Sequence, residues 1–524
     1  MSITGNWDRR ELSRRRFLGW TGLGAGALVL GAGGLSANSA LAKPFFSGDP
    51  FSLGVASGDP LPGGVVLWTR LAPEPLAEDG SGGLPPETYG VRFEVAEDEG
   101  FRRIVRRGAV EAGPELGHSV HVELDGLRPG REYFYRFKAG PEVSPVGRTK
   151  TAPAPGAPVD GLAFAFVSCQ NYANGYYTAY RNMLDEDLNL VVHLGDYIYE
   201  GDGPPPGREA AGRAHAPARE IRSLADYRIR HAQYRTDDDL QAAHESFPFV
   251  VTWDDHEVEN NWADEDSDPD TDPQDFLRRR AGAFQAYYEH MPLRRPQRPE
   301  GPDMLLYRGV TYGDLLRFNV LDTRQYRSDQ PPDRDAEGPV AFDPTRTMLG
   351  DEQERWLFDA LDRSPARWNV LAQQVPIYED ADVGAPNDKW EGYRASRERL
   401  LDFLAQRGPA NPIVITGDVH FNSVADLKAD FEDPESETVA SEFVGTSVST
   451  GGDGTARSEY DPDPANPHIK FENRGQRGYV RCTVDQNRLR TDYRMVDTVL
   501  SRQSGIETIA SFVVEDGRRG VQRA

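Results

Sequence analysis

The sequence predicts an α/β fold preceded by a separate all-β region. Three observations support this prediction: strand patterns follow one another up to about residue 152, a segment rich in proline and alanine follows at 151–158, and strands then alternate with amphipathic helices. Such alternation is typical of a largely α/β domain. A chain of 524 residues is also too long for one compact core, so two or three domains are expected.

The first 42 residues are expected to be an export signal. The segment 13–18 carries consecutive arginines, an apolar Gly/Ala-rich stretch follows over about 20–35, and Ala-Leu-Ala at 40–42 is a small-residue cleavage pattern. Glycines interrupt the apolar stretch, which makes a membrane anchor the weaker alternative. We therefore expect the twin-arginine export machinery as a partner and a secreted, periplasmic or cell-wall-associated protein. This machinery carries folded proteins, which agrees with a cofactor loaded before export.

Residues 43–155 are expected to form a β-sandwich domain. The segments 65–70, 89–95 and 118–124 show partial or full alternation of apolar and polar residues. The segment 127–137 is similar to the tyrosine-corner strand of fibronectin-type sandwiches. We therefore predict an all-β fibronectin-III/Ig-like domain, with its boundary in the linker near residue 155.

Residues 156–524 are expected to form the α/β domain. Amphipathic patterns predict helices at 178–185, 223–235, 237–246, 274–290, 351–362 and 396–406. The last strand patterns, at 442–447, 478–484 and 488–495, follow one another without long helices and suggest an antiparallel second layer. The expected architecture is therefore a four-layer αββα sandwich.

The formal charge of −25 limits the partners of this protein. Nucleic acid and anionic membrane surfaces would both repel such a chain, and no nucleic-acid-binding module is expected. An anionic substrate would need locally concentrated positive charge, which metal ions could supply. The simpler alternative is that the acidic surface only keeps the protein dissolved.

Four predicted strands end in residues that can bind metal ions. They occupy 164–169, 190–195, 249–253 and 412–417, and each is a short apolar run rich in β-branched or aromatic residues. Ligands bind outside the carboxyl ends of the strands in open α/β sheets. If the four ends converge, one crevice contains Cys169, Asp196, Tyr199, Asp255, His256, Asp418 and His420.

These side chains suit a pair of cations. Asp196 could bridge two ions, and a phenolate such as Tyr199, three residues later, is a hard ligand suited to ferric iron. His420 adds an imidazole and Cys169 a thiolate that a cation would keep deprotonated. Only two cysteines occur, so a disulfide with Cys482 is the default in an exported protein. We favour one thiolate ligand and one buried thiol, although Cys169 could also be a small buried hydrophobe.

The remaining residues point to phosphoryl chemistry. Asp255 and Asp418 offer hard oxygens for a second ion, and two cations about 3.5–4 Å apart form a clamp for in-line phosphoryl displacement. His256 could then protonate the leaving alkoxide.

The motifs resemble those of a known enzyme superfamily. Gly195–Tyr199 is similar to the G-D-x-x-Y block of purple acid phosphatases, within the calcineurin-like metallophosphoesterases. The superfamily's G-N-H-[DE] block appears as Asp254–Glu257, its G-H-x-H block as Gly417–His420, and its first-strand D-x-H as Ser168–Gln170. These departures resemble the PhoD-like alkaline phosphatases and phosphodiesterases, which also have an N-terminal sandwich and twin-arginine export. The resemblance covers nearly the whole chain.

The resemblance implies a metal assignment and a catalytic acid. It assigns Fe³⁺ to Cys169, Asp196, Tyr199 and His420, and Ca²⁺ to Asp196, Asp255 and Asp418. His256 takes the position of the general acid. Aspartates at positions 255 and 418 replace two superfamily ligands, Asn and His, and this change suits calcium better than zinc.

Three further residues are candidates for substrate contacts. Arg324 could bind the substrate phosphate, with a structural ion pair as the alternative. Asn260 could reach a metal ion or the substrate, or only end a helical turn. Asn422 could contact substrate or serve in a turn.

The leading hypothesis is a secreted metallophosphatase acting on phosphate monoesters and diesters, either small molecules or polymers. A water or hydroxide held by the metals would attack phosphorus without a covalent phosphoenzyme. One alternative is a serine hydrolase using Ser57 or Ser447, although neither lies in a G-x-S-x-G elbow. The other is a non-catalytic cell-surface binding protein stabilised by metals. The natural substrate, the ester preference and the oligomeric state are left open by the sequence.

Overall fold

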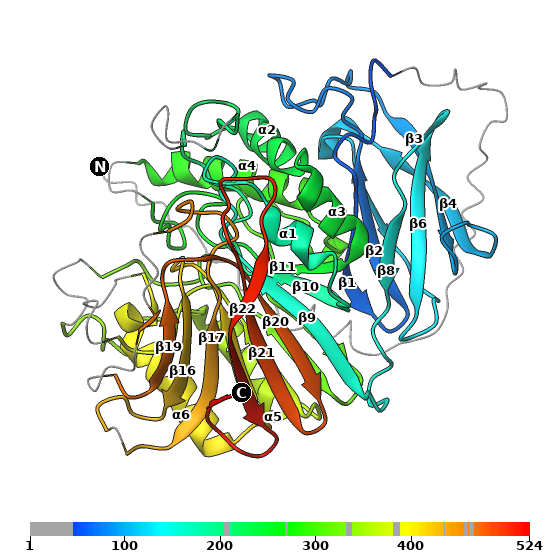
Figure 1. Ribbon diagram of the computed structural model, residues 1–524. Helices are drawn as coiled ribbons and strands as arrows, with labels where there is room; N and C mark the ends of the chain where they lie inside the picture. The colour runs from blue at the N-terminus through cyan, green and yellow to red at the C-terminus, as the bar shows by residue number, and fades with distance from the viewer. Residues whose placement is uncertain are drawn as a thin grey trace, which may run out of the picture. The chain divides into compact units, whose positions relative to one another are not determined.

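We describe the protein from a computed structural model, shown in Figure 1. The structure describes residues 46–524, apart from 204–209, 211, 268–270, 332–337, 381–387, 434, 455–458 and 461–465. The predicted export signal at 1–42 lies outside the described residues. Within the described part of the chain, no helix has the length and apolar character needed to cross a membrane.

The first sheet has ten strands. Its order is β23-β22-β21-β20-β9-β10-β11-β1-β2-β5, and β9, β10, β11 and β1 run parallel to one another at its centre. The bounds are β1 Val55–Leu61, β2 Gly64–Arg70, β5 Ser119–Glu123, β9 Gly161–Val167, β10 Leu190–His193, β11 Pro248–Val251, β20 Arg477–Asp485, β21 Arg488–Val496, β22 Ile506–Glu515 and β23 Gln522–Arg523.

The second sheet has eight strands in the order β12-β13-β14-β15-β17-β16-β19-β18. Its bounds are β12 Arg308–Tyr312, β13 Leu316–Val320, β14 Trp368–Ala372, β15 Pro412–Thr416, β16 Asn422–Lys428, β17 Thr438–Val444, β18 Glu459–Tyr460 and β19 Ile469–Asn473. The expectation that the late strands form one antiparallel second layer is wrong in part. Strand β17 pairs parallel to β15, whereas β20 and β21 extend the first sheet from its strand β9.

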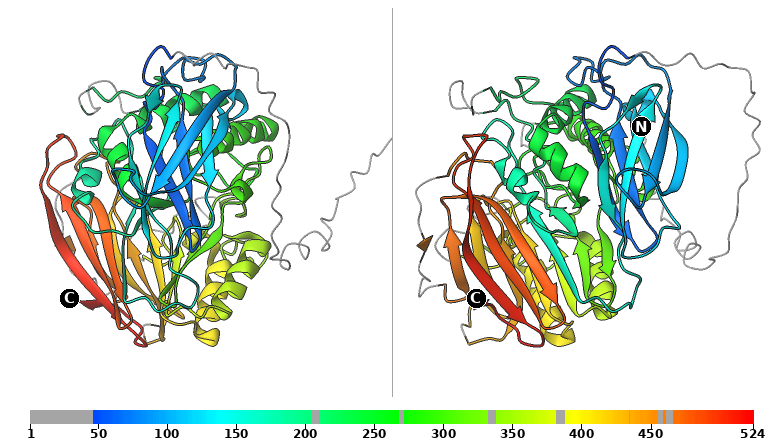
Figure 2. Two further views of the ribbon diagram at one scale, coloured as in Figure 1. Left: turned by 90° about the vertical axis from the view of Figure 1, so that its right-hand side faces the viewer. Right: turned by 45° about the vertical axis from the view of Figure 1, so that its right-hand side comes forward.

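Alternation along the strands builds the layers. In β9, Phe164 and Phe166 pack in the apolar cluster between the two sheets, whereas Ala165 and Val167 pack against the helices. Side chains alternate between the two faces of a strand, so a strand buried on both faces is apolar throughout. Helices α1 Thr178–Met183, α2 Leu224–Arg235, α3 Asp238–Ser246 and α4 Pro273–His290 cover the first sheet, and α5 Gly350–Asp362 and α6 Arg394–Arg407 cover the second. Figures 1 and 2 show this αββα order.

Side-chain caps fix where the helices over the first sheet begin. Ser223 and Asp226 form a reciprocal capping box at the start of α2. Asp237 caps α3, and Asp272 caps α4 ahead of a proline at its first position. These caps place α2, α3 and α4 within one residue of the predicted starts.

The N-terminal region is all β. A five-stranded sheet contains β3 Tyr89–Ala96, β4 Ile104–Ala112, β6 Glu132–Ala139, β7 Glu142–Val143 and β8 Gly147–Lys150. The predicted tyrosine corner is present, because the Arg128 backbone N–H donates to the Tyr133 hydroxyl oxygen (3.0 Å). The same region also supplies β1, β2 and β5 to the ten-stranded sheet, where β1 pairs with β11. The domain limits 43–155 and 156–524 stay a prediction.

The C-terminal segment lies at the amino-terminal end of β15. The Gly517 N–H donates to Asn411 Oδ1 (2.9 Å), the Val521 N–H donates to Asp426 Oδ1 (2.8 Å), and β23 closes the edge of the first sheet. Asn411 immediately precedes β15, whereas Asp418 follows it. The segment is therefore at the opposite end of this strand from Asp418.

Candidate metal centre

Strand ends from both sheets meet at one place. The Cys169 N–H donates to the Gly195 carbonyl (3.1 Å), and the Val448 N–H donates to the Ser168 carbonyl (3.0 Å). Two glycines allow this approach: a Cβ on Gly195 would lie 2.4 Å from the Asp254 nitrogen, and a Cβ on Gly417 would lie 2.3 Å from Ser168 Oγ. The convergence expected from the sequence is therefore present, with three ends from the first sheet and one from the second.

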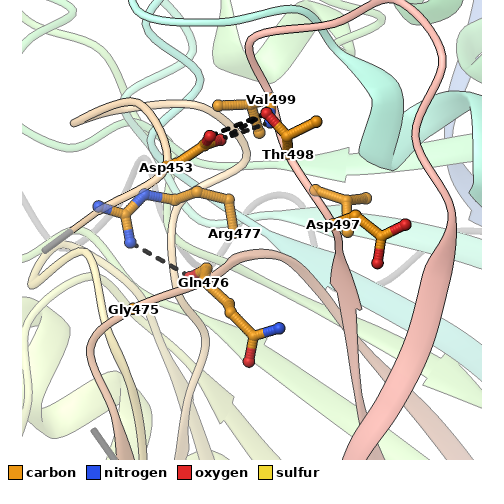
Figure 3. A pocket seen from close by; sticks show the side chains of 8 residues that line it. Asp453, Gly475, Gln476, Arg477, Asp497, Thr498 and Val499 are labelled. Atoms are coloured by element: carbon orange, nitrogen blue, oxygen red, sulfur yellow. Dashed lines mark hydrogen bonds between the residues drawn. The ribbon is translucent and has the colours of Figure 1, made fainter. Parts of the chain in front are cut away.

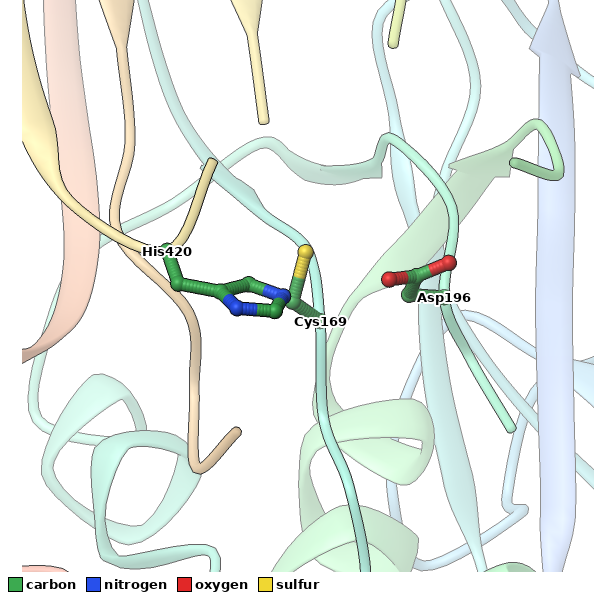
Figure 4. A group of neighbouring side chains, drawn as sticks. All are labelled: Cys169, Asp196 and His420. Atoms are coloured by element: carbon green, nitrogen blue, oxygen red, sulfur yellow. The ribbon is translucent and has the colours of Figure 1, made fainter. Parts of the chain in front are cut away.

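Three overlapping groups of side chains could hold a metal ion. In each group the potential ligand atoms lie within 4.8 Å of one another. The groups are Cys169 with Asp196 and His420, Asp196 with Asp255 and His256, and Asp254 with Asp255 and Asp418. Figure 4 shows the first group, contributed by the loops after β9, β10 and β15. Because Asp196 belongs to two groups, it is placed where a bridging carboxylate would be needed.

Four predicted ligands have a left-handed backbone. The φ angles are 58° for Cys169, 56° for Asp196, 65° for Asp418 and 60° for His420. This conformation is uncommon for residues with a Cβ, costs about 1–3 kcal/mol each, and concentrates at functional sites. These turns lie at the strand ends, where the ligand atoms of Cys169, Asp196 and His420 come within 4.8 Å of one another.

Tyr199 joins the group of Cys169, Asp196 and His420. Its hydroxyl donates to Asp196 Oδ2 (2.7 Å) and lies 3.2 Å from His420 Nε2. Thr450 Oγ1 lies 2.9 Å from the same hydroxyl and 2.7 Å from the Cys169 carbonyl oxygen. The phenol is therefore positioned at the same point as the thiol, the carboxylate and the imidazole.

Arg324 is enclosed by carboxylates. Its Nε donates to Asp254, and its other nitrogens lie 3.5 Å from Asp418, 3.6 Å from Asp388 and 3.8 Å from Asp255. The side chain has no exposed surface. This geometry favours the structural ion pair over direct contact with a substrate phosphate, so the catalytic role of Arg324 stays a prediction.

One guanidinium does not neutralise these buried acids. Burial, with Asp388 nearby, raises the pKa of Asp418 to about 6, and burial together with other acids raises the pKa of Asp196. Burial also disfavours the charged form of Asp255, but Arg324 holds the pKa of that group below its usual range. Asp196 Oδ1 has no hydrogen-bond partner among the described residues. Such a surplus of buried oxygen donors fits bound cations, which would compensate the charge.

His256 is held by Glu200, a carboxylate that was not among the predicted site residues. Its Nδ1 lies 2.6 Å from Glu200 Oε2, and its ring centroid lies 4.2 Å from that of Tyr199. Burial opposes the charged imidazole, but Glu200 and nearby aspartates raise the pKa of His256 above its ordinary value. The side chain is 20% exposed. The ring is therefore oriented and partly open to solvent, as a proton donor needs to be.

Other supporting residues had weak sequence signals. Glu257 Oε2 accepts hydrogen bonds from the backbone N–H groups of Asp196 (3.1 Å) and Asp254 (2.9 Å). Glu257 and Asp254 belong to the block that supplied Asp255, and Glu200 directly follows Tyr199, so proximity in sequence could have identified them. Thr450 lies 251 residues after Tyr199 and carried no signal.

The two asparagines occupy different environments. Asn260 is exposed, and its backbone N–H donates to Glu200 Oε1 (2.9 Å). Asn422 is fully buried, with Oδ1 accepting from the Thr446 N–H (3.0 Å) and Nδ2 lying 3.2 Å from the Met495 sulfur. Its carboxamide is engaged within the protein, which does not favour a substrate role. Both substrate assignments stay predictions.

The thiols and the candidate serine nucleophiles are buried. Both cysteines are free, and Cys482 belongs to the apolar cluster between the sheets. Ser57 and Ser447 have no exposed surface, and Ser447 Oγ donates to the Thr450 carbonyl (2.8 Å). A serine nucleophile at either position would be inaccessible to substrate.

A polar cavity of about 260 Å³ lies beside the metal centre without including any predicted ligand. Figure 3 shows its lining, which includes Asp453, Gln476, Arg477, Asp497 and Thr498. Arg477 connects it to the centre, because its nitrogens donate to the carbonyls of Thr450 (2.7 Å) and His420 (3.0 Å). The clustered donors therefore do not line this cavity.

Known proteins match the whole described region. Residues 164–493 match the family model of the PhoD-like phosphatase, and residues 36–153 match that of the PhoD-like phosphatase N-terminal domain. The chain is 50% identical to alkaline phosphatase D of Bacillus subtilis, over 99% of this chain and 90% of the relative.

Solved structures agree with the family match. A structure of PhoD matches with a TM-score of 0.85 and 50% identity, covering 92% of this chain and 93% of that one. A purple acid phosphatase from yellow lupin seeds matches with a TM-score of 0.51 at 14% identity, covering 88% of this chain and 73% of that one, which shows a shared fold alone. The non-catalytic interpretation is therefore wrong: the chain belongs to the PhoD-like phosphatase family and is an enzyme of the phosphatase class.

Proposed function

We propose that this phosphatase is exported, depends on bound metal ions, and hydrolyses phosphate diesters as well as monoesters. Fe³⁺ would be held by Cys169, Asp196, Tyr199 and His420, and Ca²⁺ by Asp196, Asp255 and Asp418. The substrates would be small-molecule or polymeric phosphate esters. The observation that carries the proposal is that the three groups of potential ligands overlap: Asp196 belongs to the first and second groups, and Asp255 to the second and third.

The chain's own residues would orient the substrate ester and supply a proton. When bound, the cations would supply Lewis acidity that activates water and neutralises the phosphate oxygens. His256 would give a proton to the leaving alkoxide, because Glu200 occupies its Nδ1 and leaves the other ring nitrogen for the substrate. Arg324 would keep Asp254, Asp255 and Asp418 together when no cation is bound.

The proposal also covers export and domain organisation. Residues 1–42 would be removed as a twin-arginine signal after the folded, loaded protein has crossed the membrane. The family match to the N-terminal domain supports a β-rich domain within residues 43–155, ahead of the catalytic domain at 156–524.

Hydrolysis of matched p-nitrophenyl phosphate mono- and diesters tests the function. The natively exported protein is assayed at alkaline pH before chelation, after chelation, and after calcium is returned. We expect activity toward both esters, loss after chelation, and recovery with calcium. Activity that resists chelation would refute metal dependence, and turnover of the monoester alone would refute the diesterase proposal.

Substitutions of two buried aspartates test the bridging role of Asp196. We expect Asp196→Asn to lose metal content and at least about 100-fold in kcat/KM, because a bridging carboxylate serves both ions. Asp492→Asn is the control, since Asp492 is equally buried in the first sheet but pairs with Arg481 (2.7 Å) and Arg490 (2.8 Å). Full metal content in Asp196→Asn would refute the bridging assignment.

A further inference from the structure

Thr450 contacts two of the predicted metal-binding residues without being a predicted ligand itself. It lies six residues after the end of β17, and its side chain is buried. Its Oγ1 lies 2.9 Å from the Tyr199 hydroxyl oxygen and 2.7 Å from the Cys169 carbonyl oxygen. We therefore expect Thr450 to act on the metal centre through Tyr199.

The hydroxyl of Thr450 has one proton and two acceptors within reach. Its oxygen accepts a hydrogen bond from the Asn171 backbone N–H (3.1 Å), and its single proton is left to be donated. The Cys169 carbonyl also accepts from the backbone N–H groups of Thr450 (3.2 Å) and Ser449 (3.4 Å). This carbonyl therefore keeps hydrogen-bond partners when the hydroxyl proton of Thr450 turns toward Tyr199.

The contacts of the Tyr199 oxygen decide which acceptor this proton takes. In this structure the Tyr199 hydroxyl donates to Asp196 Oδ2 (2.7 Å) and lies 3.2 Å from His420 Nε2. Asp196 and His420 are themselves predicted ligands, so both would be committed to Fe³⁺ when it is bound. A phenolate held by that ion only accepts hydrogen bonds, and bonds to an ionised acceptor are about twice as strong as neutral ones. Among the described residues that hydrogen-bond to this oxygen, Thr450 is the one left to donate.

Arg477 fixes the backbone of Thr450. This arginine is buried at the first position of β20, and its Nε donates to the Thr450 carbonyl oxygen (2.7 Å). Its Nη1 donates to the His420 carbonyl oxygen (3.0 Å), and Ser447 Oγ donates to the Thr450 carbonyl oxygen (2.8 Å). The rigid fork of the guanidinium thus joins the loops that follow β15 and β17. The Thr450 hydroxyl is therefore held beside the phenol by contacts that need no metal ion.

We propose that Thr450 is a positioning residue of the iron site, whose hydroxyl donates to the Tyr199 phenolate when Fe³⁺ is bound. The proposal rests on the proposed function, from which it takes the iron ligands. Groups that hydrogen-bond to a metal ligand orient that ligand and tune the ion, and their loss costs about 10- to 100-fold in metal affinity or activity. The hydrogen bond would stabilise the electrons of the phenolate, so phenolate-to-iron charge transfer would absorb at higher energy. Thr450 would thus set both the orientation of Tyr199 and the colour of the iron site.

Visible absorption and resonance Raman spectra of the iron-loaded mature protein test the proposal. Tyr199→Phe identifies the phenolate band by removing it. We expect Thr450→Val, which removes the hydroxyl at nearly constant volume, to move this band to lower energy and to lower kcat by about 10- to 100-fold. Thr450→Ser keeps the hydroxyl and should hold the band close to its unaltered position. Thr491→Val is the control, because Thr491 is also buried but lies within β21, and it should leave the band unchanged.

A measurement on the unaltered protein does not depend on whether a variant folds. The Raman bands of the phenolate should shift when the protein is loaded with iron in D₂O, because the donated proton exchanges with solvent. The absence of this shift, or an unmoved band in Thr450→Val with iron retained, would overturn the positioning role and leave the proposed metal site standing. Natively exported protein that lacks iron, or that holds iron without a phenolate band, would overturn the iron assignment of the proposed function and this proposal with it.

Discussion

At the scale of single residues, Glu200 decides what His256 can do. Glu200 is buried, and its two oxygens hold the imidazole Nδ1 (2.6 Å) and the Asn260 backbone N–H (2.9 Å). A carboxylate on Nδ1 fixes the tautomer and orientation of the ring and favours the charged form. Glu200 is thus a positioning residue for the proposed acid.

Removing the charge of Glu200 should weaken catalysis while leaving the metal site intact. We expect Glu200→Gln to lower kcat by about 10- to 100-fold with normal metal content, because the imidazole would lose its proton at lower pH. The pKa of the general acid, seen in the alkaline limb of the pH profile of kcat, should move to lower pH. Glu220→Gln, which removes a partly exposed carboxylate paired with Arg222 (2.8 Å), is the control. An unchanged profile would exclude the positioning role.

Arg324 offers a test between two roles. If Arg324 serves only in ion pairs with the buried acids, Arg324→Met should lower the free energy of unfolding of the metal-free protein by about 3–5 kcal/mol. The reason is that four acids lose their counter-charge. If it binds substrate phosphate, KM should rise while that free energy is retained. Chemical denaturation and steady-state kinetics on the same sample separate the outcomes, and Arg324→Lys should recover part of the stability in the first case.

At the scale of elements, the turn after β10 needs a residue without a side chain. Gly195 has a φ of 117°, and a Cβ there would lie 2.4 Å from the Asp254 backbone nitrogen. We expect Gly195→Ala to destabilise the protein by more than about 3 kcal/mol and to reduce metal content, since strain and overlap add. Gly156→Ala provides the matched control.

The control separates strain from overlap. Gly156 also has a positive φ, 71°, but a Cβ there meets nothing within 4 Å. Its substitution should cost only the backbone strain and leave metal content unchanged. Equal losses in the two variants, measured by denaturation and by elemental analysis, would show that the close approach of Gly195 to Asp254 is unimportant.

The elements were largely predictable, and their long-range partners were not. Hydrophobic periodicity predicted all six α-helices of the described residues and the four strands that end at the centre, because periodicity is a local property. It could not show that β1 pairs with β11, or that β20 pairs with β9, because such pairings join residues far apart in the chain. The same limit concealed Thr450 and Arg477, whose hydrogen bonds hold the loops of the centre from a distance in sequence.

The side chains that could bind metal ions were predictable for a different reason. Each predicted ligand lies two to six residues beyond the end of a buried strand, and parallel strands bring these positions to one edge. The sequence could not show that Arg324 would be enclosed by acids or that Asn422 would be fully buried. Burial depends on the packing of the second sheet against the first, which no local pattern contains.

At the scale of the whole molecule, buried histidines make the fold sensitive to acid. Burial lowers the pKa of His121 to about 4 and that of His193, His215 and His231 to about 3. Between about pH 6.5 and those values only the unfolded chain binds the protons, so their stabilisation is present above about pH 6.5 and is lost as the pH falls. Each contributes a dependence of about 1.4 kcal/mol per pH unit in that window.

The difference between two proteins isolates one of these groups. We expect the free energy of unfolding of His231→Phe to fall less steeply between pH 6 and 4 than that of the unaltered chain, by about 1.4 kcal/mol per pH unit. Phenylalanine preserves the stacking on His290, whose ring centroid lies 5.0 Å away. Denaturation of the metal-free proteins at several pH values measures the difference, and parallel curves would contradict it.

The position of the C-terminal segment has a practical consequence. Gly517 and Val521 anchor the segment at the end of β15 that lies away from Asp418, and Ala524 follows β23 at the sheet edge. A tether placed after Ala524 would therefore be attached at the end of the sheet away from the candidate metal centre. Immobilisation through this end on a bead or a sensor surface should preserve phosphatase activity, which would allow the enzyme to be reused and candidate substrates to be screened on a solid support.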